Sequence, residues 1–438
     1  MQKKAGSAQK TDSPSNYRGK QYPRSAGRVI VEEAKKHLVF SAEEMSIGYH
    51  WTLLNEKLQK TINIMTKVED VINYAQTPSL SGFDHRVIAS SLRPMIAQYE
   101  GVMMSEFPQL ATPMRNLADS PYSRPETLLR YEGRLVSNMY YWQIMYLLQC
   151  LNYVKEPRVI GEIGGGYGGL ARLWLKNPIH RPRCYLDIDF PESLFFTEVF
   201  LCISFPGLRV LYVCSPQKLD VEVLLQYQVI LCPHNFVEAV ADLSIDLVIN
   251  TSSMQEMSDD WVDFWMQWLK KKECHWFYSV NYFASPLYQM QETHSTWSPR
   301  LTPEWTIKLQ RFNPAFTKIH GAMNRNVGEI LAQKEPDKPR ISRQTATAQY
   351  QLMQKKIFDG QVLLESLDIV HSYPDEEIMW DLLQRCVKEM PVIPKESIYL
   401  AEYLNKHAST QFKTSHGEEL GNLLRQLQLV RAGSQEKI

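Results

Sequence analysis

The chain has 438 residues, of which 44% are hydrophobic and 22% charged, so it can bury one or more cores. Its formal net charge is zero, which excludes an overall charge that would attract nucleic acid or an anionic surface. The seven cysteines have no C-x-x-C spacing, which predicts free thiols rather than disulfides or a zinc site. Because we find neither a secretory signal nor an apolar run that could span a bilayer, we expect a cytoplasmic protein with no integral membrane segment.

Four regions are expected along the chain. Residues 1–28 are basic and rich in small polar residues, which predicts a disordered tail. Apolar residues at helical spacing predict a helical region over 29–120, and strand and glycine motifs predict an α/β domain over 121–335. A charged, proline-broken segment then leads into a helical extension, 336–438. The helical extensions are candidates for homo-oligomer contacts.

The segment RVIGEIGGGYGGLARLWL, residues 158–175, predicts a strand, a glycine loop and a helix. Glycine enters positive φ without a Cβ clash, so a run of glycines makes a tight turn at little cost. Such a unit brings backbone N–H groups and a helix N-terminus against a nucleotide-like ligand. The loop residues expected to hold the ligand are Gly164, Gly165, Gly166, Tyr167 and Gly168.

Two cofactors compete for this loop. Gly164, Gly166 and Gly169 satisfy G-x-G-x-x-G, a fingerprint of dinucleotide binding that is weak by itself. Glu162 stands two residues before the first glycine. Its carboxylate would repel a pyrophosphate but can accept a hydrogen bond from an α-ammonium group. S-adenosylmethionine has an ammonium group and no phosphate, so Glu162 favours the methyl donor.

A second strand, within Cys184–Glu192, ends in two acids that lie 23 and 25 residues beyond Gly164. A carboxylate at this place can accept hydrogen bonds from both ribose hydroxyls of an adenosine. Asp189 immediately precedes the Phe190-Pro191 start of the next helix, so we prefer it to Asp187. The alternative is an aspartate that only caps the helix.

The sequence indicates the next strands less clearly. Either Arg209–Val213 or Gln228–Cys232 is expected to be the third strand, and the second is the better edge for an adenine pocket. Ile245–Asn250 is a buried strand followed by polar residues, of which Asn250 and Ser252 are candidate cofactor ligands because carboxyl ends of parallel strands face the ligand.

Two late strands, Glu304–Phe312 and Val327–Lys334, are expected to form an antiparallel hairpin. Methyltransferases of the doubly wound class end their sheet in this way, whereas a dinucleotide dehydrogenase would add a parallel crossover. Before the first strand, a helix is expected over Arg124–Leu151. Arg134 and Asn138 near its N-terminal half are candidates for substrate contact in front of the glycine loop.

Four segments together resemble the bacterial sugar O-methyltransferase family, over about residues 120–335: GEIGGGYGGLARL, LDIDFPES, DLVINTSSMQEM and a strand that ends in SVNY. The resemblance implies an S-adenosylmethionine-dependent enzyme with a Rossmann-like, class I methyltransferase sheet. It matches Asp189 to the family's aspartate before Leu-Pro-Glu, although Phe190 replaces the leucine. It also implies a substrate role at Asn281, where Tyr282 replaces a common arginine.

Methyl transfer to a sugar hydroxyl needs a base or a metal, because the hydroxyl is barely ionised at neutral pH. Glu256, just past the strand beside the expected methyl group, is the leading candidate. His234, His294 and His320 are alternative bases. A divalent ion held by Glu256 with Asp259 or Asp260 is a further alternative that no diagnostic spacing indicates.

The sequence therefore predicts an S-adenosylmethionine-dependent O-methyltransferase that acts on a sugar or glycan. A nicotinamide-dependent oxidoreductase is the second hypothesis, which Glu162 and the late hairpin disfavour. A non-catalytic scaffold with a methyltransferase fold is the third, which the intact glycine loop and Asp189 disfavour.

Overall fold

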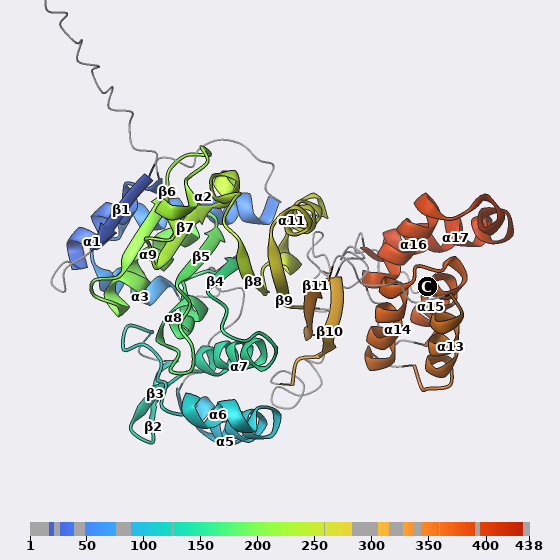
Figure 1. Ribbon diagram of the computed structural model, residues 1–438, viewed down its shortest axis with the longest axis horizontal. Coiled ribbons are helices and arrows are strands. Elements are labelled where there is room, and N and C mark those ends of the chain that lie inside the picture. The colour runs from blue at the N-terminus through green and yellow to red at the C-terminus, as the bar shows by residue number, and fades with distance from the viewer. Residues whose placement is uncertain are drawn as a thin grey trace, which may run out of the picture.

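The computed structural model describes residues 17–21, 27–38, 49–75, 89–124, 127–257, 259–282, 305–314, 327–335, 343–358, 360–389 and 395–431. Its centre is a nine-stranded sheet with helices on both faces (Figure 1). The strands of this sheet are β1 (Tyr17–Gln21), β4 (Val159–Ile163), β5 (Cys184–Asp189), β6 (Arg209–Val213), β7 (Val229–Pro233), β8 (Ile245–Thr251), β9 (Cys274–Tyr282), β10 (Trp305–Phe312) and β11 (Val327–Lys334).

The strand order is β1-β6-β7-β5-β4-β8-β9-β11-β10. All neighbours from β6 to β9 are parallel, whereas β11 is antiparallel to both β9 and β10. The expected terminal hairpin is thus confirmed. Both candidates for the third strand belong to the sheet, and β7 is the one that pairs with β5. At the far edge, β1 pairs antiparallel with β6, although its residues fall in the stretch expected to be a tail.

Period-two alternation along the strands separates two cores, one on each face of the sheet. Ile160 and Tyr185 point into the first core, whereas Ile163 and Ile188 point into the second. Helices α7, α8 and α9 cover the first face, and α11 and the turn η3 cover the second. The bounds of these and the shorter helices are α7 (Asn138–Tyr153), α8 (Gly169–Lys176), α9 (Pro191–Ser204), α10 (Val221–Leu224), η3 (His234–Val240), η4 (Met254–Glu256) and α11 (Asp259–Lys271).

Among the described residues, the N-terminal helices form no separate core. Their buried residues belong to the same cluster as those of α7, α8 and α9, so they form an outer layer on the first face. A buried contact between His37 Nδ1 and Glu198 Oε2 of α9, 2.8 Å long, ties the segment after α1 to that face. The helices are α1 (Gly27–Lys35), α2 (Tyr49–Ile64), α3 (Val68–Ala75), α5 (Ala89–Glu106) and α6 (Pro108–Met114).

The helix expected over Arg124–Leu151 is wrong for its first part. A hairpin of β2 (Leu129–Tyr131) and β3 (Arg134–Val136) precedes α7. Glu132 and Gly133 join its strands with φ of 45° and 80°. Two positive φ values in succession are typical of the type I′ turn, whose twist matches that of paired strands. Arg134 therefore lies on a strand rather than on a helix.

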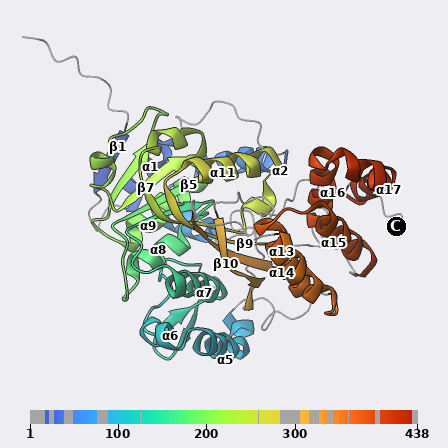
Figure 2. The ribbon, with the colours of Figure 1, turned by 45° about the vertical axis from the view of Figure 1, so that its right-hand side comes forward.

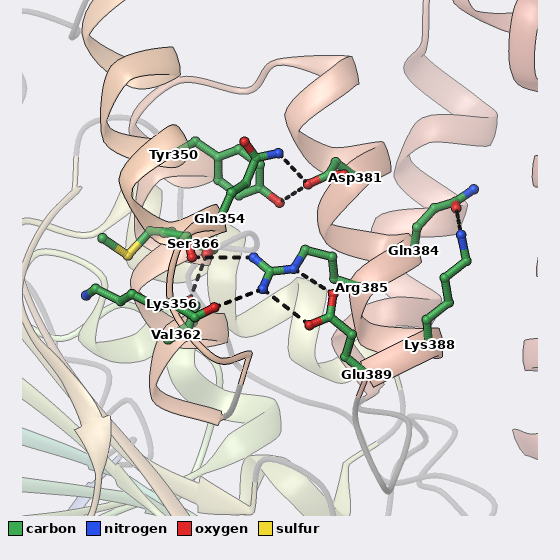
Figure 3. A network of polar contacts seen from close by, with 11 residues as sticks. Tyr350, Gln354, Lys356, Val362, Ser366, Asp381, Gln384, Arg385, Lys388 and Glu389 are labelled. Atoms are coloured by element: carbon green, nitrogen blue, oxygen red, sulfur yellow. Dashed lines mark hydrogen bonds and ion pairs between the residues drawn. The ribbon is translucent and has the colours of Figure 1, made fainter.

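The C-terminal helices form a separate bundle with its own core, which packs through α14 on β10 (Figures 1 and 2). Asp381 of α15 accepts hydrogen bonds from Tyr350 and Gln354 of α13, and Arg385 donates to the carbonyls of Met353 and Lys356 (Figure 3). These contacts hold α13 against α15. The helices are α13 (Arg343–Gln354), α14 (Gly360–Ser372), α15 (Glu376–Glu389), α16 (Lys395–His407) and α17 (Thr410–Arg431).

A buried ionic network joins the terminal hairpin to the helical layer. The Glu329 side chain of β11, 1% exposed, accepts hydrogen bonds from Arg311, Asn313 and Tyr278. Arg311 also pairs with Glu106 of α5 at 2.7 Å. The guanidinium is thus the cation that compensates a buried carboxylate.

We predict that Arg311→Ala lowers the free energy of unfolding by about 3–5 kcal/mol, because it leaves the Glu329 charge buried without its partner. Lys308→Ala on the same strand is the matched control, since Lys308 pairs with the more exposed Glu335 and its loss should cost less than about 1 kcal/mol. Urea unfolding followed by circular dichroism measures both. Equal small losses would contradict the role assigned to Arg311.

Candidate functional site

The predicted ligand residues gather at the carboxyl ends of β4, β5 and β8, where the glycine loop joins β4 to α8. This is the edge at which open α/β sheets bind ligands. Gly164, Gly166 and Gly168 have φ of 77°, 64° and 82°. The Gly164 N–H donates to the Ile188 carbonyl at 2.8 Å, which fixes the loop to the end of β5.

Side chains from three other elements pack directly against the glycines. A Cβ on Gly164 would lie 2.2 Å from Ser253 Oγ, after β8. One on Gly165 would lie 2.4 Å from Asp187 Oδ1, on β5. One on Gly168 would lie 2.8 Å from Thr197 Cγ2, on α9. The close approach of these side chains, as well as the backbone turn, therefore requires glycine here.

Asp189 closes the loop from the β5 side. Its Oδ2 accepts a hydrogen bond from the Gly166 N–H at 2.8 Å, and its Oδ1 accepts one from the Phe190 N–H at 2.6 Å. Burial raises the pKa of Asp189 to about 6 against the opposing effect of these hydrogen bonds. The Ser193 hydroxyl is a third hydrogen-bond partner of this carboxylate. A carboxylate has about four lone-pair positions, so Asp189 can still accept a hydrogen bond from a ligand hydroxyl.

Glu162 and Asp187 are buried neighbours in the register of β4 and β5. The Tyr185 hydroxyl donates to Glu162 Oε2 at 2.6 Å, while burial raises the pKa of Glu162 to about 7. Burial and the neighbouring carboxyls Glu162 and Asp189 raise the pKa of Asp187 well above its ordinary value. With Asp189, three carboxyl groups lie beside the glycine loop.

An amide network joins the ends of β4, β8 and β9. The Asn250 Nδ2 group donates to the Ile163 carbonyl at 2.8 Å, and Asn281 Nδ2 donates to Asn250 Oδ1 at 2.8 Å. Ser253 Oγ also donates to the Ile163 carbonyl, at 3.0 Å. Both side chains are buried. The candidate cofactor residue Asn250 and the candidate substrate residue Asn281 therefore contact each other directly through this hydrogen bond.

Ser252 adopts a φ of 60° at the end of β8, with its N–H donating to the Val280 carbonyl at 2.8 Å. The left-handed conformation is unfavourable for a residue with a Cβ. Residues with strained backbone conformations of this kind are found most often at functional sites. The chain thus leaves β8 through a strained turn next to the glycine loop, where Ser252 was predicted to contact the cofactor.

His234 lies at the carboxyl end of β7, with its ring 4.8 Å from that of Phe190 and 5.2 Å from that of Trp261. Burial lowers the pKa of His234 to about 4, so the ring is neutral at physiological pH. The strands β5 and β4 separate β7 from β8. At about 4.8 Å per strand, the His234 position is roughly 14 Å from the end of β8.

Tyr167, Arg134 and Asn138 make contacts within the protein. Tyr167 is buried and its hydroxyl accepts a 3.3 Å hydrogen bond from Gln143 of α7. Arg134 forms an ion pair with Glu100 of α5. Asn138, at the start of α7, accepts a 2.6 Å hydrogen bond from Tyr99, and its Nδ2 group has no hydrogen-bond partner among the described residues.

Glu256 is the last residue of the short turn η4, which begins three residues after the end of β8. Its side chain and those of His294, His320 and Asp259 lie outside the described part of the molecule. Within the described ranges, no group of three His, Cys, Asp or Glu side chains is arranged to hold a metal ion. None of the described helices is long and apolar enough to cross a membrane.

Three contacts around the site were missed in the sequence. Thr197 Oγ1 donates to the Gly166 carbonyl at 2.8 Å, and Ser253 supports Gly164. Gln59 of α2 donates to Glu192 at 2.6 Å, three residues beyond Asp189. Thr197 and Gln59 lie on helices whose apolar pattern gives no sign of a polar contact, and Ser253 was one of several polar residues in its run.

The fold is a Rossmann-like α/β fold of the class I methyltransferase type. Its sheet is parallel from β6 to β9, has helices on both faces and ends in the antiparallel strands β11 and β10. No protein-family model and no curated protein matches the chain.

Solved structures similar to this chain include methyltransferases of different kinds. An rRNA methylase from Escherichia coli has 9% identity and a TM-score of 0.30, covering 70% of this chain and 100% of its own. Another similar structure is phosphoethanolamine N-methyltransferase 1 of Haemonchus contortus in complex with phosphoethanolamine and S-adenosylhomocysteine. It has 10% identity and a TM-score of 0.32, and the match covers 70% of this chain and 59% of that one. A ribosomal protein L11 methylase from Lactobacillus delbrueckii subsp. bulgaricus has 11% identity and a TM-score of 0.27, covering 45% and 79%.

We predict that Gly165→Ala lowers the free energy of unfolding by about 1–3 kcal/mol, because its Cβ would overlap the buried Asp187 carboxyl. Gly161→Ala is the matched control in β4, where the nearest atom to a Cβ is 3.4 Å away and less movement is needed. Thermal unfolding of the three proteins measures the difference. Tolerance of both substitutions alike would show that the loop can move away from β5.

Proposed function

We propose that the protein is an S-adenosylmethionine-dependent O-methyltransferase whose acceptor is a hydroxyl of a sugar or glycan. One observation carries the cofactor assignment: Glu162, Asp187 and Asp189 lie beside the glycine loop, and no Lys or Arg in the described part of the chain pairs with them. Carboxylates disfavour a pyrophosphate and favour a ligand with ammonium and sulfonium charges.

The proposed donor would contact the protein at four places. Glu162 would accept from the α-ammonium group, and the glycine loop with Tyr167 would lie along the donor. Asp189 would accept from the ribose hydroxyls while it keeps its bonds to the Gly166 and Phe190 amides. Asn250 and Ser252 would contact the donor from β8.

His234 fits an adenine contact better than the role of base. Its lowered pKa makes it a weak proton acceptor, and two strands separate its strand from β8. Its ring packs against the rings of Phe190 and Trp261, close to Asp189 in the chain and in the sheet. Such a group of aromatic side chains could contact an adenine ring. Glu256, at the end of the turn η4 that follows β8, is therefore preferred to His234 as the base.

Methyl transfer requires the acceptor oxygen to approach the sulfonium methyl in line, and much of the rate gain comes from this positioning. The donor supplies the electrophilic methyl group, while Glu256 would take the proton of the hydroxyl. Arg134, Asn138 and Asn281 remain candidates for holding the acceptor. The Asn138 Nδ2 group is buried without a hydrogen-bond partner among the described residues, so it has hydrogen bonds left to give to an acceptor.

The sugar assignment rests on the resemblance of four sequence segments to the sugar O-methyltransferase family. The oxidoreductase hypothesis is weakened by the three carboxyl groups and by the antiparallel β10 and β11. A scaffold without activity would need neither a strained Ser252 nor glycines fitted closely to three other elements.

We expect S-adenosylhomocysteine to bind and NAD to bind negligibly, because the acids at the glycine loop accept an ammonium group and repel a diphosphate. Isothermal titration calorimetry with each ligand measures this. NAD binding without binding of the methyl donor or its product would overturn the cofactor assignment. Labelled methyl donor with a panel of nucleotide sugars and glycans then identifies the acceptor by mass shift.

We expect Glu256→Gln to lower turnover by about 10²–10⁴-fold with donor affinity near normal, since glutamine keeps the shape and loses the basicity. Single-turnover methyl transfer and donor titration separate the two effects. Loss of wild-type activity on adding a chelator would favour a metal held by Glu256. Near-normal turnover of Glu256→Gln would instead assign the carboxylate a structural role and move the search to His294 and His320.

A further inference from the structure

Asp187 is the most unusual polar group in the molecule's centre. Its side chain is 0% exposed, and neither carboxyl oxygen has a well-formed hydrogen bond among the described residues. The Thr197 hydroxyl and the Gly165 N–H lie close enough to lower the pKa of Asp187, but the Thr197 hydroxyl donates to the Gly166 carbonyl. Buried carboxyls in folded proteins are nearly always hydrogen-bonded or paired, because the charge is otherwise left without compensation. The Asp187 oxygens point at Gly165, in the middle of the proposed donor site.

Glu162 is the register partner of Asp187 and faces the same side of the sheet. Besides the Gly165 N–H, the groups that act on the two carboxyls are side chains from four elements, and they are carboxyls, thiols and hydroxyls rather than cations. They are Cys150 of α7, Tyr185 and Asp189 of β5, Thr197 of α9 and Cys232 of β7.

Two adjacent buried carboxylates without a cation repel each other, so one favours its protonated form. The pKa values of both groups are raised, that of Glu162 to about 7 and that of Asp187 well above its ordinary value, with burial as the largest cause. The pair therefore binds protons in the pH range in which free carboxylic acids are fully ionised.

Building on the proposed function, we infer that Glu162 and Asp187 together form a proton-linked receptor for the ammonium group of the donor. In the cofactor-free protein the pair holds a proton that offsets their repulsion. The arriving ammonium group takes over that role, and the proton passes to solvent. The only bond broken is the O–H bond of the protonated carboxyl. The pair with one proton and the ionised pair with one ammonium group have the same net charge.

This linkage has a defined sign. A cation stabilises the ionised pair, so binding releases protons and donor affinity rises with pH until the pair is ionised in the free protein. With a pKa of about 7 for Glu162, affinity should rise by up to about tenfold between pH 6 and pH 7.5. The ligand's own α-amino group remains mostly protonated over this range.

The experiment is calorimetric titration of the full-length protein with S-adenosylhomocysteine at pH 7 in buffers of different ionisation enthalpy. The slope of the observed enthalpy against buffer enthalpy gives the protons exchanged per ligand. We expect release of about half a proton or more from the wild-type protein.

Glu162→Gln/Asp187→Asn should bind more weakly, release almost no proton and lose the pH dependence. Glu192→Gln is the matched control, because Glu192 is also a buried acid, close to Asp189, but it bonds to Gln59. It should release protons as the wild type does. The ligand's own amine titrates equally in all three proteins.

Binding without proton exchange by the wild type would overturn this inference and leave the proposed cofactor intact. Release that persists in the double variant would also overturn it, because the proton would then come from another group. Absence of binding by the wild type would overturn the proposed function itself, and the inference with it. The wild-type buffer series decides the matter even if the double variant fails to fold.

Discussion

The close fit between the glycine loop and its neighbours is the constraint on which the site depends. Gly164, Gly165 and Gly168 each lie where a Cβ would overlap a side chain from β5, α9 or the turn after β8. Because those side chains come from separate elements, the loop takes its shape only when the sheet and α9 are packed together. The loop is thus a product of the tertiary fold as much as of its glycines.

The same packing brings acids together at the cost of burying them. Asp189 bonds to the Gly166 and Phe190 amides, Glu162 bonds to Tyr185, and Asp187 has no well-formed hydrogen bond among the described residues. A buried acid without a partner is unfavourable in the folded protein alone. It becomes understandable if the site is complete only with a cation, which is the chemistry proposed for the methyl donor.

The surrounding layers hold this edge of the sheet in place. The N-terminal helices share a core with α7, α8 and α9, and Arg311 joins α5 to the terminal hairpin through Glu106 and Glu329. The amide network of Asn250 and Asn281 connects neighbouring strand ends.

The elements with local signals could be predicted from the sequence alone: the strand, glycine loop and helix around residue 164, the buried strand ending at Asn250, and the terminal hairpin. Alternation and glycine content depend only on neighbouring residues, so they can be interpreted without the fold. The turn of Glu132 and Gly133 was equally local but was overlooked. Three features became known only from the folded chain: β7 rather than β6 pairs with β5, Arg134 pairs with Glu100, and Asp187 is buried without a well-formed hydrogen bond. Each of these depends on residues distant in the chain, because strand order and the burial of a polar group follow from long-range packing that no local pattern encodes.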